Sequence, residues 1–390
     1  MFIVIHSKLS VFLLSEISKK KYKTFSNLKM EHRLVTRKST LESELQSSQK
    51  VPKLLDPYNS NKEISSEKTQ TFELGNLPDE VTLKILSYLS MKELINCGQV
   101  AKRIRAISHD ETLWRKVNLH RKPWQLKTVP TEFLEMILNN GCKHLTLKGA
   151  KLVGNLGLDK TSHLSYLDLE DCEASSDKVF EDLLASCYSL EKLSLPEITL
   201  TSKFVKKMCY QNGKTLQILN LCNCVGLNLE SMKHIADNCT ELREVDFSFI
   251  PNGTCARIPQ DAWIYLANNL TPKIIKLDLS GQKELKDEHG KALVSRCNKI
   301  TDLDLYGTSI SNLTLMSIIG NLKLTLEKLK LPGWQDIHYV NLIQLKSFSR
   351  LRRLDCILHC NCCDFKSLKK QLPHVSINPQ YELLYLDASV

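Results

Sequence analysis

The sequence lacks the motifs of the common enzyme classes. None of the patterns G-x-x-x-x-G-K-[ST], H-E-x-x-H, G-x-S-x-G and G-x-G-x-x-G occurs in its 390 residues, so it has no motif for phosphate binding, zinc proteolysis, serine hydrolysis or dinucleotide binding. Cys209, Cys255 and Cys356 are present, but a thiol acts as a nucleophile only where its surroundings favour the thiolate. We therefore expect a non-catalytic protein that uses no small-molecule cofactor.

The sequence also lacks a long uninterrupted apolar run. Residues 2–14 are apolar but are interrupted by His6, Ser7 and Lys8, and the stretch is too short to span a membrane. No basic segment precedes it, as one would in a signal peptide. A weak signal peptide remains the alternative, and Met30 is a second candidate start that would remove the stretch. We expect no membrane partner.

Most of the chain has little excess of positive charge. The net charge is +10, but residues 1–50 carry ten Lys or Arg and four Glu, so the remaining residues supply only +4. Nucleic-acid binding would require a basic face on a folded domain, and none is expected. Residues 15–71 are rich in Ser, Lys, Glu and Gln and poor in aromatics, which predicts disorder. Lys19-Lys20-Lys21 is either a nuclear-import patch or a solvated charge run.

The first folded element that the sequence predicts is a small helical unit between Leu77 and Leu119. Pro78, Asp79 and Glu80 form a helix start, because proline needs no donor there and carboxylates suit the positive end of the helix dipole. Apolar residues then recur at helical spacing; they are Val81, Ile85, Leu86, Leu89, Leu94, Ile95, Val100, Ile104 and Ile107. A unit this small buries little surface alone, so its surplus apolar side chains indicate a partner.

This stretch resembles an F-box. The matching residues are Leu77-Pro78, Glu80, Ile85-Leu86, Leu89, Leu94, Val100, Lys102-Arg103, Leu113-Trp114 and Leu119. Ile104 and Met91 stand where the family usually has Trp and Pro. The resemblance implies binding to a Skp-type adaptor, and through it to a cullin–RING ubiquitin ligase. The adaptor-binding residues that it implies are Leu77, Pro78, Glu80, Ile85, Leu86, Leu89, Leu94, Val100 and Trp114. An ordinary three-helix core without a partner is the alternative.

After a predicted helix over residues 131–139, the chain repeats itself. The pattern L-x-x-L-x-L recurs at intervals of 22, 26, 26, 26, 32, 26, 26 and 25 residues, with matching positions at Leu145, Leu167, Leu193, Leu219, Val245, Leu277, Leu303, Leu329 and Leu354. A period near 26 with this pattern is typical of leucine-rich repeats. The longest interval predicts a loop insertion around residues 251–259. Helices are expected between the strands, for example over residues 178–186, 231–238, 261–269 and 288–296.

The fold class that follows is α/β. Each repeat has one apolar face that it cannot cover alone, so neighbouring repeats stack. We expect a small helical F-box followed by a right-handed leucine-rich-repeat solenoid, or horseshoe, with the strands on its concave face. We assign residues 1–71 to a disordered basic leader, 72–120 to the F-box, 121–141 to a linker helix, 142–378 to the repeats and 379–390 to a C-terminal tail.

Six of the 14 cysteines lie at fixed distances from strand leucines: Cys142, Cys172, Cys187, Cys224, Cys239 and Cys297. Cysteine is small and readily buried, so these are predicted core thiols of a reducing compartment rather than disulfides. The glycosylation sequons at Asn238, Asn252, Asn269 and Asn312 are then coincidental. The cluster of His359, Cys360, Cys362 and Cys363 lacks the second, spaced pair of a zinc site, so no metal site is predicted.

Beyond the helical unit the chain resembles the S-phase-kinase-associated family of F-box proteins. The matching segments are SHDETLWRKVNL, LREVDFSF, ITDLDL and LKKQLPHVSIN. The resemblance implies a substrate receptor of an SCF-type (Skp–cullin–F-box) ligase that recruits a protein, such as a cell-cycle regulator, for ubiquitination and proteasomal degradation in the nucleus and cytoplasm. In that family a long C-terminal tail helps to hold a small phosphate-binding accessory protein; here residues 379–390 follow, which leaves that partner open. A repeat scaffold without ligase activity is the alternative.

The side chains that alternate with the inward leucines are predicted to line the concave face. They are acidic in the middle of the repeats, at Asp168, Glu170, Glu244, Asp246, Asp278, Asp302 and Asp304. They turn basic at Lys328, Lys330 and Arg353, which predicts contact with an acidic or phosphorylated target segment. The aromatic anchors predicted for that target are Phe249, Tyr306 and Trp334. The alternative is that these charges are only a solvated surface.

Overall fold

The computed structural model describes residues 77–119, 128–154, 156, 163–174, 177–249, 257–332, 337–356 and 362–378. The predicted leader, the predicted C-terminal tail and most of the predicted insertion around residues 251–259 lie outside these residues. The chain divides into two compact units, Met1–His109 and Asp110–Val390. We call their described parts the helical unit and the repeat unit. In the described residues no helix is long and apolar enough to cross a membrane.

The helical unit contains the three predicted short helices, α3 (Asp79–Leu86), α4 (Met91–Cys97) and α5 (Lys102–Ser108). Helix α3 begins at Asp79, so Pro78 is its N-cap rather than its first helical residue. The buried residues of the unit are few: Thr82, Leu86, Leu94, Cys97, Gly98, Ile104 and Ser108. A Cβ added to Gly98 would lie 2.7 Å from Ser108 Oγ, so glycine is needed for the close packing of α4 on α5.

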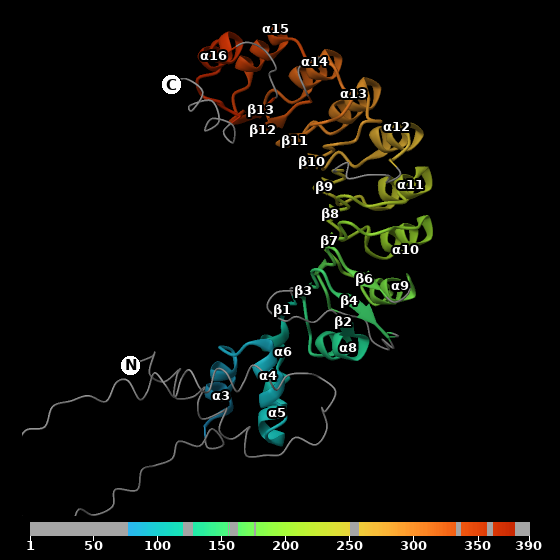
Figure 1. Ribbon diagram of the computed structural model, residues 1–390, viewed down its shortest axis with the longest axis vertical. Coiled ribbons are helices and arrows are strands. Elements are labelled where there is room, and N and C mark those ends of the chain that lie inside the picture. Colours follow the sequence, from blue (N-terminus) through green and yellow to red (C-terminus); the bar gives the residue numbers. More distant parts are fainter. Residues whose placement is uncertain are drawn as a thin grey trace, which may run out of the picture. The chain divides into compact units, whose positions relative to one another are not determined.

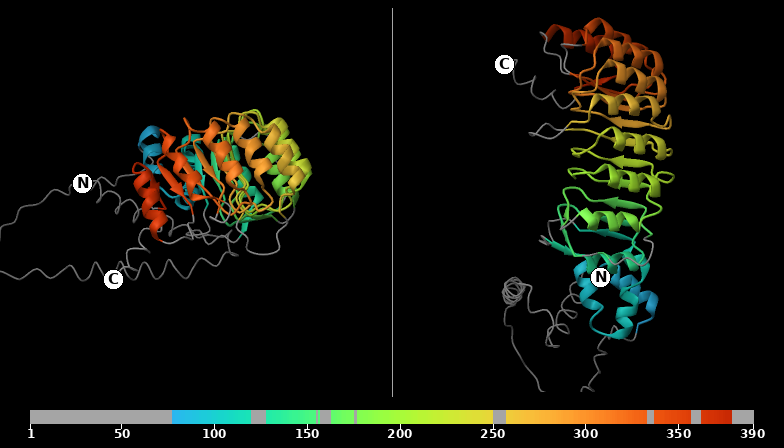
Figure 2. Two further views of the ribbon diagram at one scale, coloured as in Figure 1. Left: turned by 90° about the horizontal axis from the view of Figure 1, so that it is seen from above. Right: turned by 90° about the vertical axis from the view of Figure 1, so that its right-hand side faces the viewer.

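The repeat unit is built on one parallel sheet of eleven strands, which lie on the inner side of an arc of helices (Figure 1). The nine predicted strands are all present as β3 (His144–Thr146), β5 (Tyr166–Asp168), β7 (Lys192–Ser194), β8 (Ile218–Asn220), β9 (Glu244–Asp246), β10 (Lys276–Asp278), β11 (Asp302–Asp304), β12 (Lys328–Lys330) and β13 (Arg353–Asp355). Figure 2 shows them stacked as successive rungs. The fold class is therefore confirmed.

Two strands of this sheet, one at each edge, were not predicted from the sequence. Strand β1 (Lys116–Asn118) pairs with β3, and β14 (Ser376–Ile377) pairs with β13. Neither shows a full L-x-x-L-x-L pattern, because the first leucine position is occupied by Trp114 before β1 and by His374 before β14. A second, three-stranded parallel sheet was also missed; its strands are β2 (Thr128–Pro130), β4 (Lys151–Val153) and β6 (Glu173–Ala174).

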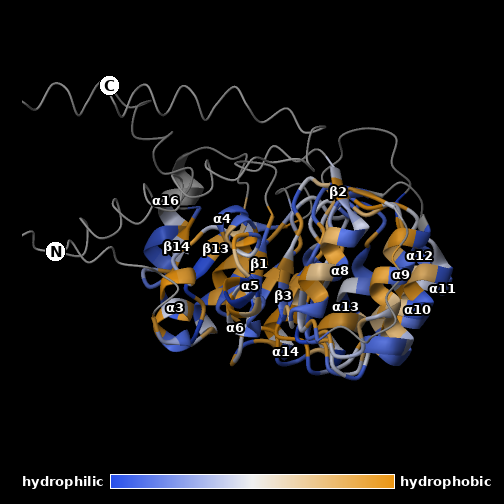
Figure 3. Cartoon of the chain, turned by 90° about the horizontal axis from the view of Figure 1, so that it is seen from below, coloured by the Kyte–Doolittle hydropathy of each residue, from blue (hydrophilic) through white to orange (hydrophobic). Residues whose placement is uncertain are grey.

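The outer layer consists of one helix per repeat, and the four helices named from the sequence are present within one or two residues. The layer comprises α8 (Thr131–Asn139), α9 (Asp177–Ala185), α10 (Ser202–Asn212), α11 (Leu229–Asn238), α12 (Gln260–Asn269), α13 (Asp287–Arg296), α14 (Asn312–Asn321), α15 (Tyr339–Leu342) with the 3-10 turn η2 (Ile343–Ser347), and α16 (Cys362–Gln371). Helix α8 lies between β1 and β3 in the chain, as the later helices lie between later strands. Strands and helices carry both hydrophobic and hydrophilic residues (Figure 3), as elements buried on one side do.

Side chains on one helix cap the next. The carboxylate of Asp287, the first residue of α13, accepts hydrogen bonds from the backbone N–H groups of Ser311 and Thr314 at 2.8 and 3.0 Å, at the start of α14. In the same way Asn312 of α14 accepts the N–H of His338, the N-cap of α15, at 2.9 Å. The first N–H groups of a helix lack the usual acceptor four residues earlier within the helix, so these caps tie neighbouring repeats together.

Candidate functional site

Helix α3 has two unlike faces. The inner face places Thr82 and Leu86 in the core, with exposed fractions of 0% and 1%. The outer face carries Val81 and the half-buried Ile85, and Tyr88 continues this spacing in the turn just after the helix. Val81 and Tyr88 are 44% and 65% exposed. Leaving three apolar or aromatic residues on one exposed stripe is unfavourable in an isolated unit. We call Val81, Ile85 and Tyr88 the α3 stripe.

The predicted adaptor-binding residues fall on both faces. Of these residues, Pro78 and Glu80 are exposed. The other predicted residues that solvent still reaches are half-buried: Leu77, Ile85, Leu89 and Val100. Leu86 and Leu94 were both predicted to bind the adaptor, but they are buried, with exposed fractions of 1% and 3%. Both belong to the inward face of an amphipathic helix, which spacing alone did not separate from the outward face. Val81 and Tyr88 were missed as site residues, although the i, i+4, i+7 spacing identifies them.

Trp114 is the third predicted adaptor residue that is buried. It ends α6 (Glu111–Trp114), which belongs to the repeat unit, and its side chain is 1% exposed. Three residues later Val117 is the inward residue of β1, so Trp114 takes the position that Cys142 takes before Leu145 of β3. The end of the F-box-like stretch is therefore the first rung of the repeats, and Trp114 is a core residue.

Polar contacts hold the entry to α3. Arg103 of α5 donates to Asp79 Oδ1 through Nη2 at 2.6 Å and through Nε at 2.9 Å, and it also donates to the carbonyl of Leu77. Ser90 and Glu93 form a reciprocal capping box at the start of α4. The Arg103 pair is exposed, so it contributes roughly 0–1 kcal/mol. The main effect of these hydrogen bonds is to fix the direction in which the backbone of Leu77 and Pro78 enters α3.

The second candidate surface is the concave face of the sheet. Five residues, each the last of its strand, use a side-chain oxygen to accept the N–H two residues later; they are Asp168, Asn220, Asp246, Asp278 and Asp304, at distances of 3.1, 2.9, 2.8, 2.9 and 3.0 Å. Asp and Asn favour this local bond because their short side chains reach it. The acidic character predicted for the middle of this face is thus partly structural, since it closes the turn after each strand.

After six of the strands the turn also has one residue in the left-handed region. Gly149, Asp171, Glu197, Asn223, Gly281 and Gly307 share this position, each with φ between 54° and 77°. A Cβ on Gly281 would lie 1.6 Å from the carbonyl oxygen of Phe249, so only glycine fits there. This repeated position was not predicted from the sequence, because Asp, Glu and Asn occupy it in three repeats.

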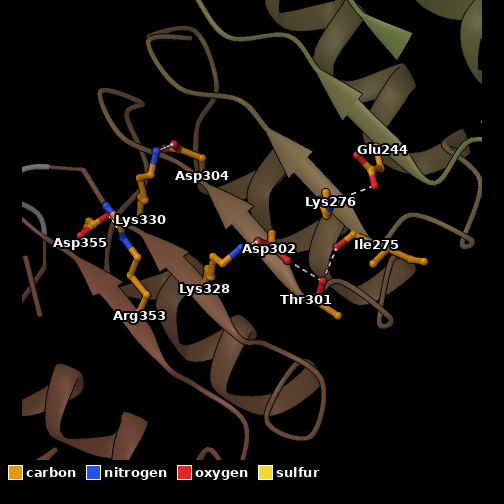
Figure 4. Close-up of polar contacts among 10 residues, drawn as sticks. All are labelled: Glu244, Ile275, Lys276, Thr301, Asp302, Asp304, Lys328, Lys330, Arg353 and Asp355. Atoms are coloured by element: carbon orange, nitrogen blue, oxygen red, sulfur yellow. Dashed lines mark hydrogen bonds and ion pairs between the residues drawn. The ribbon is translucent and has the colours of Figure 1, made fainter. Parts of the chain in front are cut away.

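The basic end predicted for the concave face is neutralised within the sheet (Figure 4). Lys328 Nζ lies 2.7 Å from Asp302, and Lys330 Nζ lies 2.5 Å from Asp304, in both cases across the β11–β12 pair. Arg353 pairs with Asp355 of its own strand at 2.8 Å. The three predicted substrate-binding cations are at the predicted face, but each already holds a carboxylate.

The predicted aromatic anchors differ in outcome. Tyr306 is 47% exposed, just past the end of β11. Phe249 is 7% exposed and is therefore a core residue, so its prediction as an exposed anchor is wrong. The reason is that Phe249 lies two residues after the buried Phe247, and the inward alternation of β9 continues past the end of the strand. Trp334 lies outside the described residues.

Asp278 has the most perturbed carboxyl on this face. Burial, the charge of Asp304 and, more weakly, the charge of Asp246 raise its pKa from 3.8 to about 6, and hydrogen bonds from Ser280 only partly oppose them. The three carboxylates are in register on β9, β10 and β11, and adjacent strands lie about 4.8 Å apart. Like charges at that spacing disfavour simultaneous ionisation.

No group of three or more His, Cys, Asp or Glu residues in the described part of the chain is placed to hold a metal ion. The side chains of the His359–Cys363 cluster lie outside that part. The six predicted core thiols are buried. Cys142 occupies the first leucine position of its repeat, whereas Cys239 and Cys297 are helix C-caps. Burial raises the pKa of Cys142 and Cys297 to about 11 and that of Cys172 and Cys224 to about 12, so these thiols are poor nucleophiles.

Comparison with known proteins also finds an F-box-like part and a repeat part, although its F-box-like part includes α6 and β1 of the repeat unit. The family model described as the SKP2 LRR domain matches residues 132–382, and an F-box-like family model matches residues 74–120. F-box/LRR-repeat protein 21 from Bos taurus is 22% identical over 200 residues, and that from Mus musculus is 20% identical over 199. Each match covers 45% of this chain and 45% of the relative, so the chain spans about half the length of these curated relatives.

Among solved structures, the chain matches the crystal structure of the Rad7 and Elc1 complex in yeast at a TM-score of 0.32 and 12% identity, with 92% of this chain and 93% of that chain covered. The family model of the repeats alone covers more than half of the present sequence. The chain belongs to the F-box/leucine-rich-repeat proteins with a repeat domain of the SKP2 type.

Proposed function

We propose that this protein is the substrate-recognition subunit of an SCF-type ubiquitin ligase. In this function the helical unit binds a Skp-type adaptor, which links it to a cullin–RING ligase, and the repeats present a target protein for ubiquitination. The support is that an F-box-like domain and an SKP2-type repeat domain occur in one chain. Further support comes from relatives described as F-box/LRR-repeat proteins. The protein itself performs no covalent step in this scheme.

The observation that carries the proposal is the α3 stripe. Val81 and Tyr88 are exposed on a unit with only a small core of its own, and Leu77, Leu89 and Val100 are half-buried. Full burial of a large aliphatic side chain contributes about 1.5–3 kcal/mol, so covering several of these residues would supply a stable contact. A Skp-type adaptor is the partner that the family implies for this surface.

The finer parts of the function remain proposals. The target binds the concave face, is ubiquitinated and is degraded by the proteasome, and a cell-cycle regulator is the class that the SKP2-type repeat domain suggests. Recognition of a phosphorylated target, with help from a small phosphate-binding accessory protein, is a variant of this proposal. We place the complex in the nucleus and cytoplasm, a location that buried free thiols are compatible with.

Adaptor capture tests the proposal. The full chain is co-expressed with a Skp-type adaptor and compared with the Leu77→Ala/Pro78→Ala variant and with a Tyr210→Ala control, whose side chain on α10 is 83% exposed. We expect the wild type and the control to capture adaptor equally, and the double variant to lose most of it with unchanged circular dichroism. Full capture by the double variant would contradict the proposed adaptor surface.

A repeat scaffold without ligase activity is the competing function. It predicts no adaptor in complexes purified from cells, whereas the proposed receptor co-purifies with adaptor and target when cullin neddylation is blocked. The polar outer face that a capping unit needs is absent from α3, where Val81 and Tyr88 are exposed. This observation favours the receptor.

A further inference from the structure

The concave face over β9, β10 and β11 carries more carboxylates than it can neutralise. Glu244 and Asp246 lie on β9, Asp278 on β10, and Asp302 and Asp304 on β11. These side chains flank the buried residues of each strand, so they project from the concave side of the sheet. The only basic side chain on these three strands is Lys276.

The lysines of β10 and β12 are already committed to other carboxylates (Figure 4). Lys276 pairs with Glu244 at 2.8 Å, and Lys328 and Lys330 of the next strand pair with Asp302 and Asp304. Among the described residues no cationic side chain lies within ion-pair distance of Asp246 or Asp278. These two half-buried carboxylates are the counter-charges that remain available.

A second observation points to the same deficit of donors. Asp355 holds Arg353 through Oδ2, and its side chain is only 9% exposed. Its Oδ1 atom is buried and accepts no hydrogen bond from any residue that the structure describes. A buried carboxylate oxygen without a donor is unfavourable by roughly 1–3 kcal/mol. On β13, two strands beyond β11, an acceptor is therefore unsatisfied, whereas Lys328, Lys330 and Arg353 are all paired.

The raised pKa of Asp278 has the same origin. Desolvation and the neighbouring charges of Asp304 and Asp246 oppose its ionisation. A positive charge brought against Asp278 would offset both effects, since it would replace lost solvation and screen the like charges. An anion at this place would increase the repulsion.

We propose that the concave face over β9–β11 receives a cationic target segment, with Asp246 and Asp278 as the carboxylates that pair with its Lys or Arg side chains. This inference rests on the proposed function, because it names the chemical class of the target for the face already assigned to it. It reverses the expectation of an acidic or phosphorylated segment, which would have to displace Asp302, Asp304 and Asp355 from Lys328, Lys330 and Arg353.

Tyr306 adds a contact suited to arginine. It lies two residues after Asp304, whose Oδ1 accepts the Tyr306 N–H at 3.0 Å, and its side chain is 47% exposed. A guanidinium can stack on an aromatic ring and bind a carboxylate through two parallel hydrogen bonds. A lysine ammonium offers a point charge without that fork. We therefore expect arginine to bind more tightly than lysine.

Cys222 provides a built-in reporter for occupancy. Of the cysteines that the structure describes, it alone is not buried. It follows β8, and its thiol lies near Ser248, Asp246 and Asp278. Burial raises the pKa of this thiol, a hydrogen bond with Ser248 lowers it, and the charges of Asp246 and Asp278 raise it further. A segment seated over Asp246 and Asp278 covers this thiol. Cys224, two residues away and buried, serves as the internal reference.

The test uses the full chain and three labelled peptides that differ only in three residues of a Gly-Ser backbone: arginine, glutamate or phosphothreonine. Binding is followed by fluorescence anisotropy, and Cys222 alkylation is followed by mass spectrometry. We expect the arginine peptide to bind and to slow alkylation of Cys222, and we expect the other two peptides to do neither. The affinity should fall with added salt, because exposed ion pairs are screened.

Two double variants give opposite predictions. Asp246→Asn/Asp278→Asn keeps an oxygen that accepts the Ser248 and Ser280 N–H groups, so folding is preserved, and we expect the arginine peptide to bind at least ~10-fold more weakly, equivalent to about 1.4 kcal/mol. Lys328→Gln/Lys330→Gln releases Asp302 and Asp304, and we expect tighter binding of the arginine peptide. Thermal melts of both variants confirm that the fold is retained.

Several outcomes would overturn the inference. One is that the phosphothreonine or glutamate peptide binds the wild type and no longer binds the Lys328/Lys330 variant. A second is that the arginine peptide binds both variants equally well. A third is that the arginine peptide does not bind at all. Adaptor capture is measured on the same preparations. Loss of capture with intact arginine-peptide selectivity would reject the proposed receptor function alone, and the reverse result would reject the inference alone.

Discussion

The helical unit and the repeat unit use apolar side chains in opposite ways. In the repeat unit the inward residues from Leu145 to Leu354 are at most 3% exposed, and each is covered by its neighbours along the sheet. In the helical unit the α3 stripe stays uncovered although a core of seven residues is formed. Stacked repeats complete one another's cores, whereas three short helices cannot. Buried apolar surface is therefore concentrated in the repeats, and exposed apolar surface in the α3 stripe.

The largest effect is expected in the core of the repeats. Leu277 on β10 is 2% exposed between β9 and β11, so Leu277→Ala should lower the free energy of unfolding by about 2–5 kcal/mol. Leu324→Ala, at a position that is 72% exposed, is the control and should change it by roughly 0.5 kcal/mol or less. Urea unfolding followed by circular dichroism measures both; equal effects would show that the repeats do not form one continuous core.

The two faces of α3 should respond differently to substitution. Val81→Ser/Tyr88→Ser removes apolar surface from the α3 stripe, and we expect adaptor affinity to fall by at least ~10-fold, equivalent to about 1.4 kcal/mol, with little change in stability. Leu86→Ala, on the buried face, should instead destabilise the helical unit by about 2–5 kcal/mol. Titration calorimetry and thermal melts separate the two effects. Unchanged adaptor affinity in the Val81/Tyr88 variant would remove the stripe from the interface.

The cap between α13 and α14 should contribute measurably to stability. Asp287→Ala deletes the acceptor for Ser311 and Thr314, and we expect a loss of about 0.5–2 kcal/mol. Glu288→Ala is the control, because Glu288 is the next residue along the chain and its side chain is 61% exposed. Burial acts to raise the pKa of Asp287, but the hydrogen bonds from Ser311 and Thr314 hold it below 3.8. The contribution of Asp287 is therefore present at neutral pH and lost as the pH falls below about 4.

A persistent difference between wild type and Asp287→Ala down to pH 2 would contradict that account. The measurement is urea unfolding at several pH values between 2 and 7. Glu288→Ala should follow the wild-type curve throughout, because its side chain is exposed and exposed surface substitutions rarely matter.

Asp278 should show the opposite dependence on pH. Its pKa is raised to about 6 in the folded chain, so the wild type loses stability as the pH rises from about 4 to about 6. Asp278→Asn avoids this loss and should be more stable than wild type at pH 7, by on the order of 1 kcal/mol, and equal to it near pH 4. Asp246→Asn is the matched control, since its other in-register neighbour is the uncharged Asn220. A stabilisation at pH 7 that persists at pH 4 would rule out a titration effect.

The smallest effect concerns cysteine reactivity and leaves stability unchanged. Native alkylation should be slow at Cys142, Cys172, Cys187, Cys224, Cys239 and Cys297, which are buried, and faster at Cys222, which is not. Peptide mass spectrometry after timed alkylation resolves each site. Disulfides among the six buried cysteines in the native protein would overturn the assignment to a reducing compartment.

Much of the repeat architecture was predictable, because a leucine in a regular pattern occupies the same structural position in every copy. The nine strands from Leu145 to Leu354 follow from spacing alone. The edge strands β1 and β14 were not predictable, since Trp114 and His374 replace the first leucine of the pattern and only hydrogen bonding to β3 and β13 defines these strands. The helical unit was predicted as three helices, but the residues on its two faces were confused.

On the concave face the sequence predicted the positions of the side chains but not their ion-pair partners. Sequence determined which side chains alternate with the leucines, and so it placed Lys328, Lys330 and Arg353 on that face. It could not determine their partners, because Asp302 and Asp304 lie 26 residues earlier and meet the lysines only when β11 and β12 pair in register. Local periodicity is a property of one segment, whereas net charge at a surface depends on every strand beside it. Only the tertiary structure decided that the cations are paired and that Asp246 and Asp278 are not.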